Sequence, residues 1–458
     1  MSTLARWTAA ALASLAVLSS PASPAPAAAS SAVVRQAPMS TAEEAKAFFA
    51  ASLQRTVSDY GLSADTSLFE VRAEIDPRNP RRATLTGATT NREALAALCA
   101  SLAGGGMILE NAVRVLPEKL AMADRVWAIV AAPEALLRPM RPADLDADGA
   151  ASIEKRPAAA SLSLGMPVKL YAKDASGELR LASSPDGRMG WLRAQDLFIG
   201  TDASLLAWNR RAKVIVTAPD AMLYPAKDDG KTLIGEGVPV PMGAILAQDL
   251  GFVVETGPET RADSATAPSS HWRVRLPSGE VRYLERTAAA ALPDFEEKTE
   301  TLRRSEPAKF LAQIAHGAKS LKGRSMSESA FLRSSFLLGG LVIPSQAERA
   351  AYIERPRHPG KGRSAVRAGD LLVFGSREGN QPKHIGVALG RGQGAAVVDG
   401  VVKVSTIASL EKTLGALLWT ERLDATQLAD PCMLSTRSHP YWQTPPVELS
   451  PCRLRPHG

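Results

Sequence analysis

Residues 325–344 read SMSESAFLRSSFLLGGLVIP, and this stretch carries the start of a helix. Ser325 and Glu328 have the Ser-x-x-Glu spacing of a capping box, in which two side chains satisfy backbone N–H groups of the first turn. The negative charge of Glu328 also suits the first turn, because the helix dipole is positive there. We therefore interpret Glu328 as a capping residue, with a catalytic role for its carboxylate as the alternative.

Two further motifs complete an ordered set with this helix. Residues 367–374 read RAGDLLVF, and residues 384–390 read HIGVALG. The set resembles the NlpC/P60 family of cell-wall cysteine peptidases, where a helix opening with Asp-Cys-Ser-Gly precedes the motifs Pro-Gly-Asp-Leu-Val-Phe-Phe and His-Val-Gly-Ile-Tyr-Leu-Gly. The resemblance implies a papain-like α+β domain over residues 300–425.

In that family a cysteine thiolate, activated by a histidine, attacks an amide of the peptidoglycan stem peptide. Counting back from the end of the first motif puts Glu328 at the cysteine position, and a carboxylate cannot form the thioester. The resemblance makes His384 the catalytic histidine, although a retained structural role is equally open. The third residue, which orients the histidine, falls near Val398 or Asp399, and only Asp399 could orient an imidazole.

Polar residues near these motifs are the expected substrate contacts. The resemblance assigns this role to Ser327, Ser329 and Asp370, with Ser327 standing where some members carry an aspartate that binds a substrate amine. Ser327 or Ser329 could also replace the thiol, but a shift of one residue would move the hydroxyl off the family geometry. The histidines show no metal-ligand spacing, so we expect neither a metal nor a cofactor.

The N-terminus has the pattern of a signal peptide over residues 1–32. Arg6 gives a positive charge, residues 7–18 form a short apolar run, and Ala25-Pro26-Ala27 offers a small-x-small cleavage site. The run is shorter than the roughly 20 apolar residues of a membrane span, although a retained anchor is the alternative. We expect a periplasmic or secreted protein with no membrane span after cleavage.

The length and the net charge of the chain limit the number of domains and the kinds of partner that we expect. At about 100–200 residues per domain, 458 residues predict several domains. The net charge of +7 would suit an anionic partner, but Lys and Arg are scattered and form no basic stripe with aromatic residues. Nucleic acid is therefore not an expected partner, whereas peptidoglycan, its stem peptides or a cell-wall enzyme are.

The three cysteines are Cys99, Cys432 and Cys452, an odd number for an oxidising compartment. Cys432 and Cys452 lie in a Pro-rich tail over residues 426–458, each after a proline, and we expect them to form a disulfide. Cys99 lies on an apolar helix face, which favours a buried hydrophobic role over a reactive thiol.

Residues 40–120 are expected to form a small α/β domain. Thr41 and the two glutamates after Ala42 predict the start of a helix, and alternation over residues 68–75 predicts a strand. A second strand, a helix capped by Thr90 and Asn91, and a third strand over 108–116 follow. The expected order is therefore strand, strand, helix, strand.

Residues 121–200 and 205–292 each read as short strands separated by turns. In the first segment Pro185-Asp186-Gly187 predicts a hairpin turn before Trp191, and in the second Pro277-Ser278-Gly279 precedes Tyr283. These features resemble bacterial SH3-type (SH3b) domains, so a duplicated barrel is expected. Trp191 is either a packing residue or a ligand contact.

The sequence thus predicts a multi-domain α+β protein: an α/β domain, two SH3-like β-barrels and an NlpC/P60-like domain. The replacement of the nucleophile by Glu328 predicts an exported pseudoenzyme that binds or scaffolds peptidoglycan. The alternative is an active γ-D-glutamyl endopeptidase that cleaves stem peptides with another nucleophile.

Overall fold

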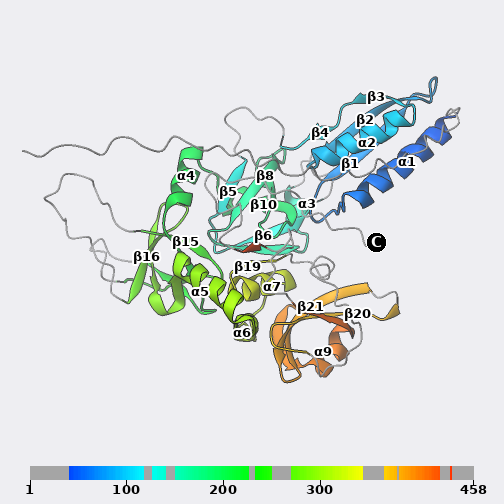
Figure 1. The fold of residues 1–458 in the computed structure, drawn as a ribbon. Coiled ribbons are helices and arrows are strands. Elements are labelled where there is room, and N and C mark those ends of the chain that lie inside the picture. The colour runs from blue at the N-terminus through cyan, green and yellow to red at the C-terminus, as the bar shows by residue number, and fades with distance from the viewer. Residues whose placement is uncertain are drawn as a thin grey trace, which may run out of the picture. The chain divides into compact units, whose positions relative to one another are not determined.

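The computed structural model describes residues 41–117, 126–140, 150–225, 233–249, 270–343, 366–378, 381–422 and 434–435. It confirms a mixed α+β chain with several sheets (Figure 1). No helix among these residues has the length and apolar character to cross a membrane. The predicted signal peptide and the predicted disulfide between Cys432 and Cys452 lie outside the described residues.

The first part of the chain packs two helices on one small sheet. Its elements are α1 (Ala42–Asp59), β1 (Phe69–Ile75), β2 (Arg82–Thr89), α2 (Arg92–Gly104), β3 (Ile108–Asn111) and β4 (Arg114–Val115). Strand β1 is antiparallel to β2, whereas β3 and β4 are parallel to it. The predicted element order is confirmed, with the third strand divided in two. Thr41 and Glu44 form the capping box of α1, and Asn91 caps α2.

Two seven-stranded sheets follow, here called the first sheet and the second sheet. The first contains β5 (Trp127–Val130), β6 (Glu134–Pro139), β7 (Ala160–Ser163), β8 (Pro167–Lys173), β9 (Leu179–Ser183), β10 (Met189–Arg193) and β11 (Leu197–Phe198). The second contains β12 (Lys213–Val216), β13 (Met222–Tyr224), β14 (Val238–Pro239), β15 (Ile245–Gln248), β16 (His271–Arg275), β17 (Val281–Glu285) and β18 (Ala289–Ala291). The short helices of this region are α3 (Ala150–Glu154) and α4 (Asp202–Arg210).

The two sheets repeat one strand order. The first runs β11-β5-β8-β9-β10-β6-β7, and the second, read from its far end, runs β18-β12-β15-β16-β17-β13-β14. The sheets also touch: the amide of Ile245 donates to the carbonyl of Leu164 at 3.3 Å. Gly165, with φ of +83°, allows this approach, because a Cβ there would lie 1.6 Å from the Ile245 carbonyl oxygen.

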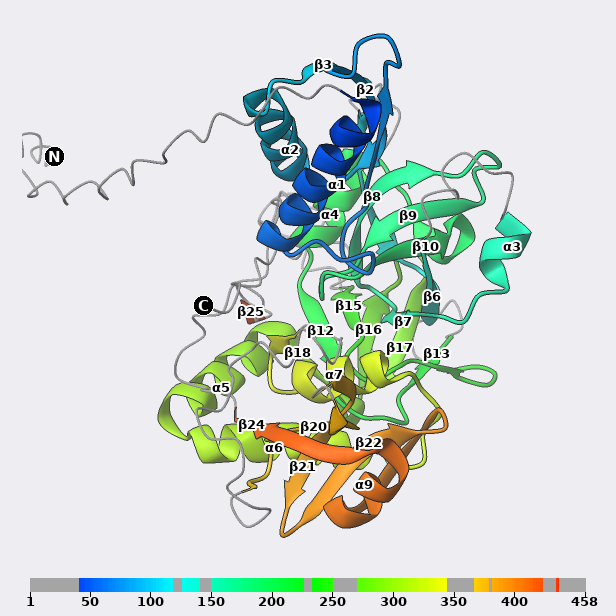
Figure 2. The same cartoon turned by 90° about the vertical axis from the view of Figure 1, so that its right-hand side faces the viewer.

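The last part of the chain surrounds an antiparallel five-stranded sheet of order β23-β22-β21-β20-β24 (Figure 2). Its strands are β20 (Leu371–Ser376), β21 (Gln381–Gly390), β22 (Gln393–Val398), β23 (Val401–Thr406) and β24 (Ala416–Glu421). The helices of this part are α5 (Leu292–Ser305), α6 (Pro307–Ser320), α7 (Glu328–Leu337) and α9 (Ile407–Leu414). A separate pair of strands consists of β19 (Leu341–Val342) and β25 (Leu434–Ser435).

The five-stranded sheet buries an apolar layer on each face. On one face α6 and α7 contribute Phe310, Phe331 and Phe336 to a core that includes Ile385 of β21. On the other face Ile407 and Leu410 of α9 pack in a separate core with Leu372, Phe374 and Ala396. Because successive side chains of a strand point to opposite faces, the motifs of β20 and β21 supply both layers.

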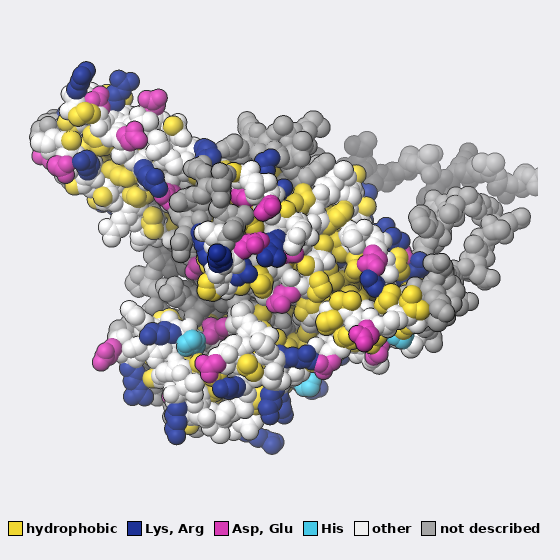
Figure 3. Space-filling model, turned by 180° about the vertical axis from the view of Figure 1, so that it is seen from behind, with side chains coloured by type: hydrophobic (Ala, Val, Ile, Leu, Met, Phe, Trp, Pro, Cys, Tyr) yellow, Lys and Arg dark blue, Asp and Glu magenta, His cyan; other side chains and the backbone are white. Residues whose placement is uncertain are grey.

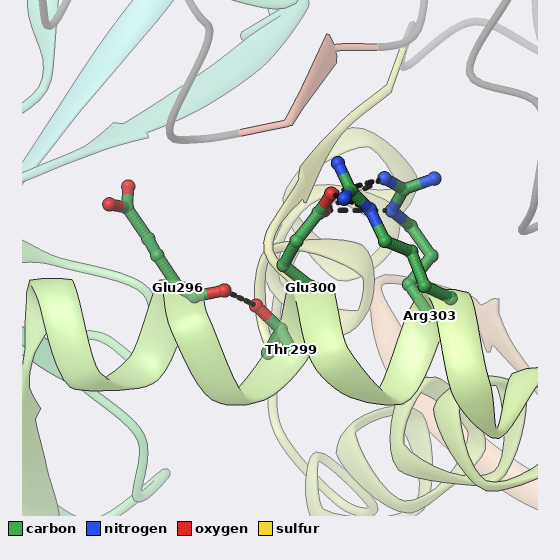
Figure 4. A network of polar contacts seen from close by, with 5 residues as sticks. Glu296, Thr299, Glu300 and Arg303 are labelled. Carbon is green, nitrogen blue, oxygen red and sulfur yellow. Dashed lines mark hydrogen bonds and ion pairs between the residues drawn. The ribbon is translucent and has the colours of Figure 1, made fainter.

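Helix α5 links the second sheet to this region. Its Leu292 and Phe295 share an apolar cluster with Ile245 of the second sheet and Leu337 of α7. Further along α5, Glu300 binds Arg303 and Arg304, and the Thr299 hydroxyl donates to the carbonyl of Glu296 (Figure 4). Burial alone would raise the pKa of Glu300, but the two arginines hold it below its ordinary value.

Helix α7 is enclosed on almost every side. Its buried residues are Ser329, Ala330, Phe331, Leu332, Arg333, Ser335, Phe336 and Leu337. A helix that is buried all round belongs to the interior, so its position depends on tertiary packing more than on helix propensity.

We expect Phe331→Ala to lower the free energy of unfolding by about 3–5 kcal/mol, because it removes a completely buried ring from the core beneath α7. Chemical denaturation of the full chain measures this loss. The control is Ile108→Ala at an exposed position of β3, which should change stability by less than about 0.5 kcal/mol. Equal losses in the two variants would contradict the central position of α7.

Candidate functional site

Helix α7 begins at Glu328, one residue after its cap. The Ser327 hydroxyl accepts a hydrogen bond from the amide of Ala330 at 3.2 Å. The predicted capping box of Ser325 and Glu328 is therefore wrong. Ser325 lies two residues before the cap, where it forms an isolated β-bridge with Val401. The side chain of Glu328 is consequently not committed to the capping box.

The Glu328 carboxylate contacts the imidazole of His384 on β21. Their Oε2 and Nδ1 atoms lie 3.2 Å apart. The Glu328 side chain is 23% exposed and the His384 side chain 43% exposed, so solvent reaches the pair. Helix α7 and strand β21 thus bring together two residues that are 56 positions apart in the sequence.

This contact changes the proton affinity of His384. The hydrogen bond to Glu328 is the largest effect and raises the pKa of the imidazole. Partial burial and the positive charge of Lys383 lower this pKa, whereas the negative charge of Glu328 raises it further. The result is a His384 pKa above its ordinary value. The stabilisation from this pair is therefore complete below the ordinary histidine pKa and disappears as the pH rises through the raised value.

Within the described residues, Asp399 makes no hydrogen bond or ion pair with His384. It lies in the turn between β22 and β23 with φ of +52°, its side chain is 89% exposed, and its carboxylate lies 3.9 Å from Lys403. Gly386 of β21 pairs with Ala396 of β22. Continued by two residues, this register puts Val398, and not Asp399, opposite His384. Glu328 contacts Nδ1 of the imidazole, and that Asp399 orients the histidine stays a prediction.

The two serines next to Glu328 serve the helix. Ser327 provides the cap, and buried Ser329 accepts a hydrogen bond from Nη2 of Arg333 at 3.3 Å. Neither hydroxyl has a hydrogen bond to His384 among the contacts of the described residues. The structure therefore does not bring an activated hydroxyl to the imidazole.

Asp370 is buried and has internal hydrogen-bond partners, and its predicted contact with a substrate stays a prediction. Its carboxylate accepts bonds from Nε and Nη2 of Arg422 at 2.9 and 2.8 Å, and from the amide of Arg367 at 2.8 Å. The preceding Gly369, with φ of +86°, passes so close to α6 that a Cβ would lie 2.5 Å from the Leu311 carbonyl oxygen. The Gly-Asp motif therefore shapes the entry to β20.

Trp191 is completely buried, which favours the packing role over a ligand contact. It packs with Leu181 and Met189 of the first sheet and with Leu68 and Leu116 of the preceding α/β region. The alternative interpretation, that this ring is a packing residue, agrees with the structure.

Cys99 is the cysteine within the described residues. It is a free, half-buried thiol on α2, and it packs against the core of the first α/β region. Burial raises its thiol pKa, and a hydrogen bond to backbone opposes this effect only in part, so the neutral thiol is favoured. No cluster of three or more His, Cys, Asp or Glu in the described part of the chain could hold a metal ion.

The direct contact between Glu328 and His384 was not predicted, although the signal for it was present. The family resemblance placed Glu328 at the nucleophile position, and in that family the nucleophile contacts the histidine.

Arg333 gave no such signal, because a single arginine in an apolar helix does not reveal its partners.

The comparisons with known proteins find structural likeness only. No family model and no curated protein matches the sequence. Similar solved structures include an NlpC/P60 family protein from Bacillus cereus ATCC 10987, with 15% identity, a TM-score of 0.45, and coverage of 65% of this chain and 99% of the other. An NlpC/P60 endopeptidase from Photobacterium damselae subsp. piscicida has 13% identity, a TM-score of 0.39, and coverage of 68% and 75%. NlpC2 from Trichomonas vaginalis has 11% identity, a TM-score of 0.27, and coverage of 63% and 95%.

We expect Glu328→Gln to lower the pKa of His384, because the neutral amide removes the charge that favours the imidazolium. NMR titration of the His384 ring protons measures this change. Asp399→Asn is the matched control: it also removes one carboxylate, but from a position without a contact to His384, and should leave the titration unchanged. A shift in the control and none in Glu328→Gln would show that Asp399 orients the imidazole.

Proposed function

We propose that this protein is an exported peptidoglycan-associated pseudoenzyme, which binds stem peptides or scaffolds a cell-wall enzyme without cleaving the peptide. The observation that carries the proposal is the carboxylate of Glu328, which lies 3.2 Å from His384 at the N-terminus of α7. In the NlpC/P60-like interpretation this is the place of the attacking thiolate.

The chemistry of a carboxylate supports binding over cleavage. Attack on an amide by Glu328 would have to form an anhydride, which is much less stable than the amide it replaces. A thiolate would form a thioester that water can hydrolyse. The Glu328–His384 pair instead offers a carboxylate acceptor and an imidazole N–H donor, both partly exposed, to the polar groups of a peptide.

The repeated topology of the two sheets is consistent with a pair of SH3b-type domains before the NlpC/P60-like region. The mixture of positive and negative side chains suits an extended polar ligand better than a compact anionic ligand. On the face shown in Figure 3, Lys and Arg side chains are interspersed with Asp and Glu. Peptidoglycan stem peptides, which carry both carboxylates and amines, are the ligand class that we propose.

We expect purified protein to release no new fragments from muropeptides and to be retained by purified sacculi at low salt. Liquid chromatography of the muropeptides and a pull-down on the sacculi measure the two properties. New fragments from the unmodified protein that disappear in His384→Ala would reject the pseudoenzyme and favour an active endopeptidase. Loss of retention at low salt would reject the ligand.

We expect Glu328→Cys to create a reactive thiol, because the helix N-terminus and His384 both favour a thiolate at this position. The pH dependence of alkylation by iodoacetamide should give a thiol pKa below about 7.5. The control Glu328→Cys/His384→Ala should move the pKa back toward the ordinary value of about 8.5. A pKa that is ordinary in both variants would contradict the equivalence of Glu328 to the nucleophile position.

A further inference from the structure

Two arginines and one aspartate form a cluster on the second sheet. Arg273 and Arg275 are alternate residues of β16, so their side chains point to the same face of the sheet. The buried carboxylate of Asp249 forms an ion pair with Nε of Arg273 at 3.0 Å and accepts a hydrogen bond from Nη2 of Arg275 at 3.2 Å. One carboxylate thus holds two guanidinium groups, and one positive charge of the cluster is left without a matching anion within it.

The two arginines differ in how they use their donors. Arg275 also donates from Nη1 to the carbonyl of Gly279 at 2.8 Å, so both of its terminal nitrogens are occupied. The two Nη atoms of Arg273 have no hydrogen bond or ion pair within the described ranges of the chain. Because the Arg273 side chain is 24% exposed, a ligand can reach it. Its free end presents the pair of N–H groups that a planar carboxylate accepts.

Aromatic residues continue the face on which Arg273 lies. In the strand register Arg273 is opposite Tyr283 of β17, and Tyr283 is opposite Tyr224 of β13. Residues that are opposite in neighbouring strands share a face, so the guanidinium lies beside a row of two aromatic rings. Tyr224 is partly exposed, and its ring meets that of His271 edge to face, with the centroids 6.3 Å apart. Glu285 shares this face but lies opposite His271, at the start of β16.

The equivalent position of the first sheet is apolar and covered. In the shared strand order β9 and β10 correspond to β16 and β17. Leu181, which is opposite Trp191, therefore corresponds to Arg273, which is opposite Tyr283. Leu181 and Trp191 are completely buried in an apolar cluster with Leu68 of the preceding α/β region. The first copy thus uses this surface for packing, whereas the second copy has a partly exposed cation there.

We propose that Arg273, held in place by Asp249, binds a free carboxylate of a peptidoglycan stem peptide, while Tyr224 packs against the neighbouring part of the peptide. The one unbalanced charge of the cluster matches a carboxylate, which carries a single negative charge, better than a phosphate, which carries up to two. The inference rests on the proposed function. It adds a contact on the second sheet that shares no residue with the Glu328–His384 pair.

Calorimetric titration of the full chain with soluble muropeptides tests this site. The two probes are a muropeptide with free carboxylates and the same muropeptide with these groups converted to amides. Arg273→Gln should weaken binding of the first probe about tenfold or more, because it removes a charge-assisted pair of hydrogen bonds. It should leave binding of the amidated probe unchanged, because that probe has no carboxylate for Arg273 to bind. Excess inorganic phosphate should not displace the first probe.

Arg282→Gln on β17 is the matched control. The Arg282 side chain is 20% exposed and forms an ion pair with Glu280, but it lies opposite Val274 and therefore on the other face of the sheet. This control should change the Kd by less than about twofold. If circular dichroism shows that Arg273→Gln does not fold, the comparison uses Arg273→Lys, which keeps the charge but loses the paired donors and should weaken binding about threefold or more.

The outcomes separate this site from the proposed function. Equal binding of the free-carboxylate muropeptide by the unmodified protein and by the folded Arg273 variant would overturn the site and leave the proposed function standing. Displacement by inorganic phosphate would overturn the assignment of the ligand as a carboxylate. If the unmodified protein bound neither muropeptide, the proposed function would fail and the site with it.

Discussion

The burial of α7 is the constraint on which the rest of the structure depends. The helix packs its aromatic residues against α6 and β21, its Arg333 against the first sheet, and its Leu337 against the second. A polar group in such a position must have a partner, because an unpaired buried donor or acceptor costs about 1–3 kcal/mol. The Ser335 hydroxyl meets this demand by donating to the carbonyl of Phe331 at 2.7 Å.

Only the first turn of α7 escapes this enclosure, and its chemistry follows from the helix dipole. Ser327 and Glu328 are partly exposed, whereas the residues that follow, with the exception of Ser334, are buried. An anion at this end is stabilised by the unpaired amides of the first turn. A thiolate and a carboxylate satisfy this electrostatic demand equally, and each can pair with an imidazolium. The fold can therefore retain the pair in the absence of a nucleophile that forms a thioester.

The sequence predicted the elements of this site better than the roles of its side chains. The helix after Ser325 was recognised from its local pattern, and the two motifs that contain Asp370 and His384 coincide with the entry to β20 and with β21. The contacts of Asp370, Asp399 and Trp191 could not be predicted, since they depend on partners far away in the chain or on burial. The start of α7 was placed two residues early because a Ser-x-x-Glu spacing does not distinguish the cap at Ser327 from one at Ser325.

The repeated sheets show how one topology can serve two purposes. Trp191 on β10 and Tyr283 on β17 occupy equivalent strands, and both rings are buried, so the packing role of this strand is common to the two copies. The contacts to α7 are different: the first sheet offers the carbonyl of Ser161 to Arg333, and the second offers a backbone carbonyl to Ser334 and a glycine to Leu337. Helix α7 therefore contacts the first sheet through a buried guanidinium, and the second through a hydroxyl and an apolar side chain.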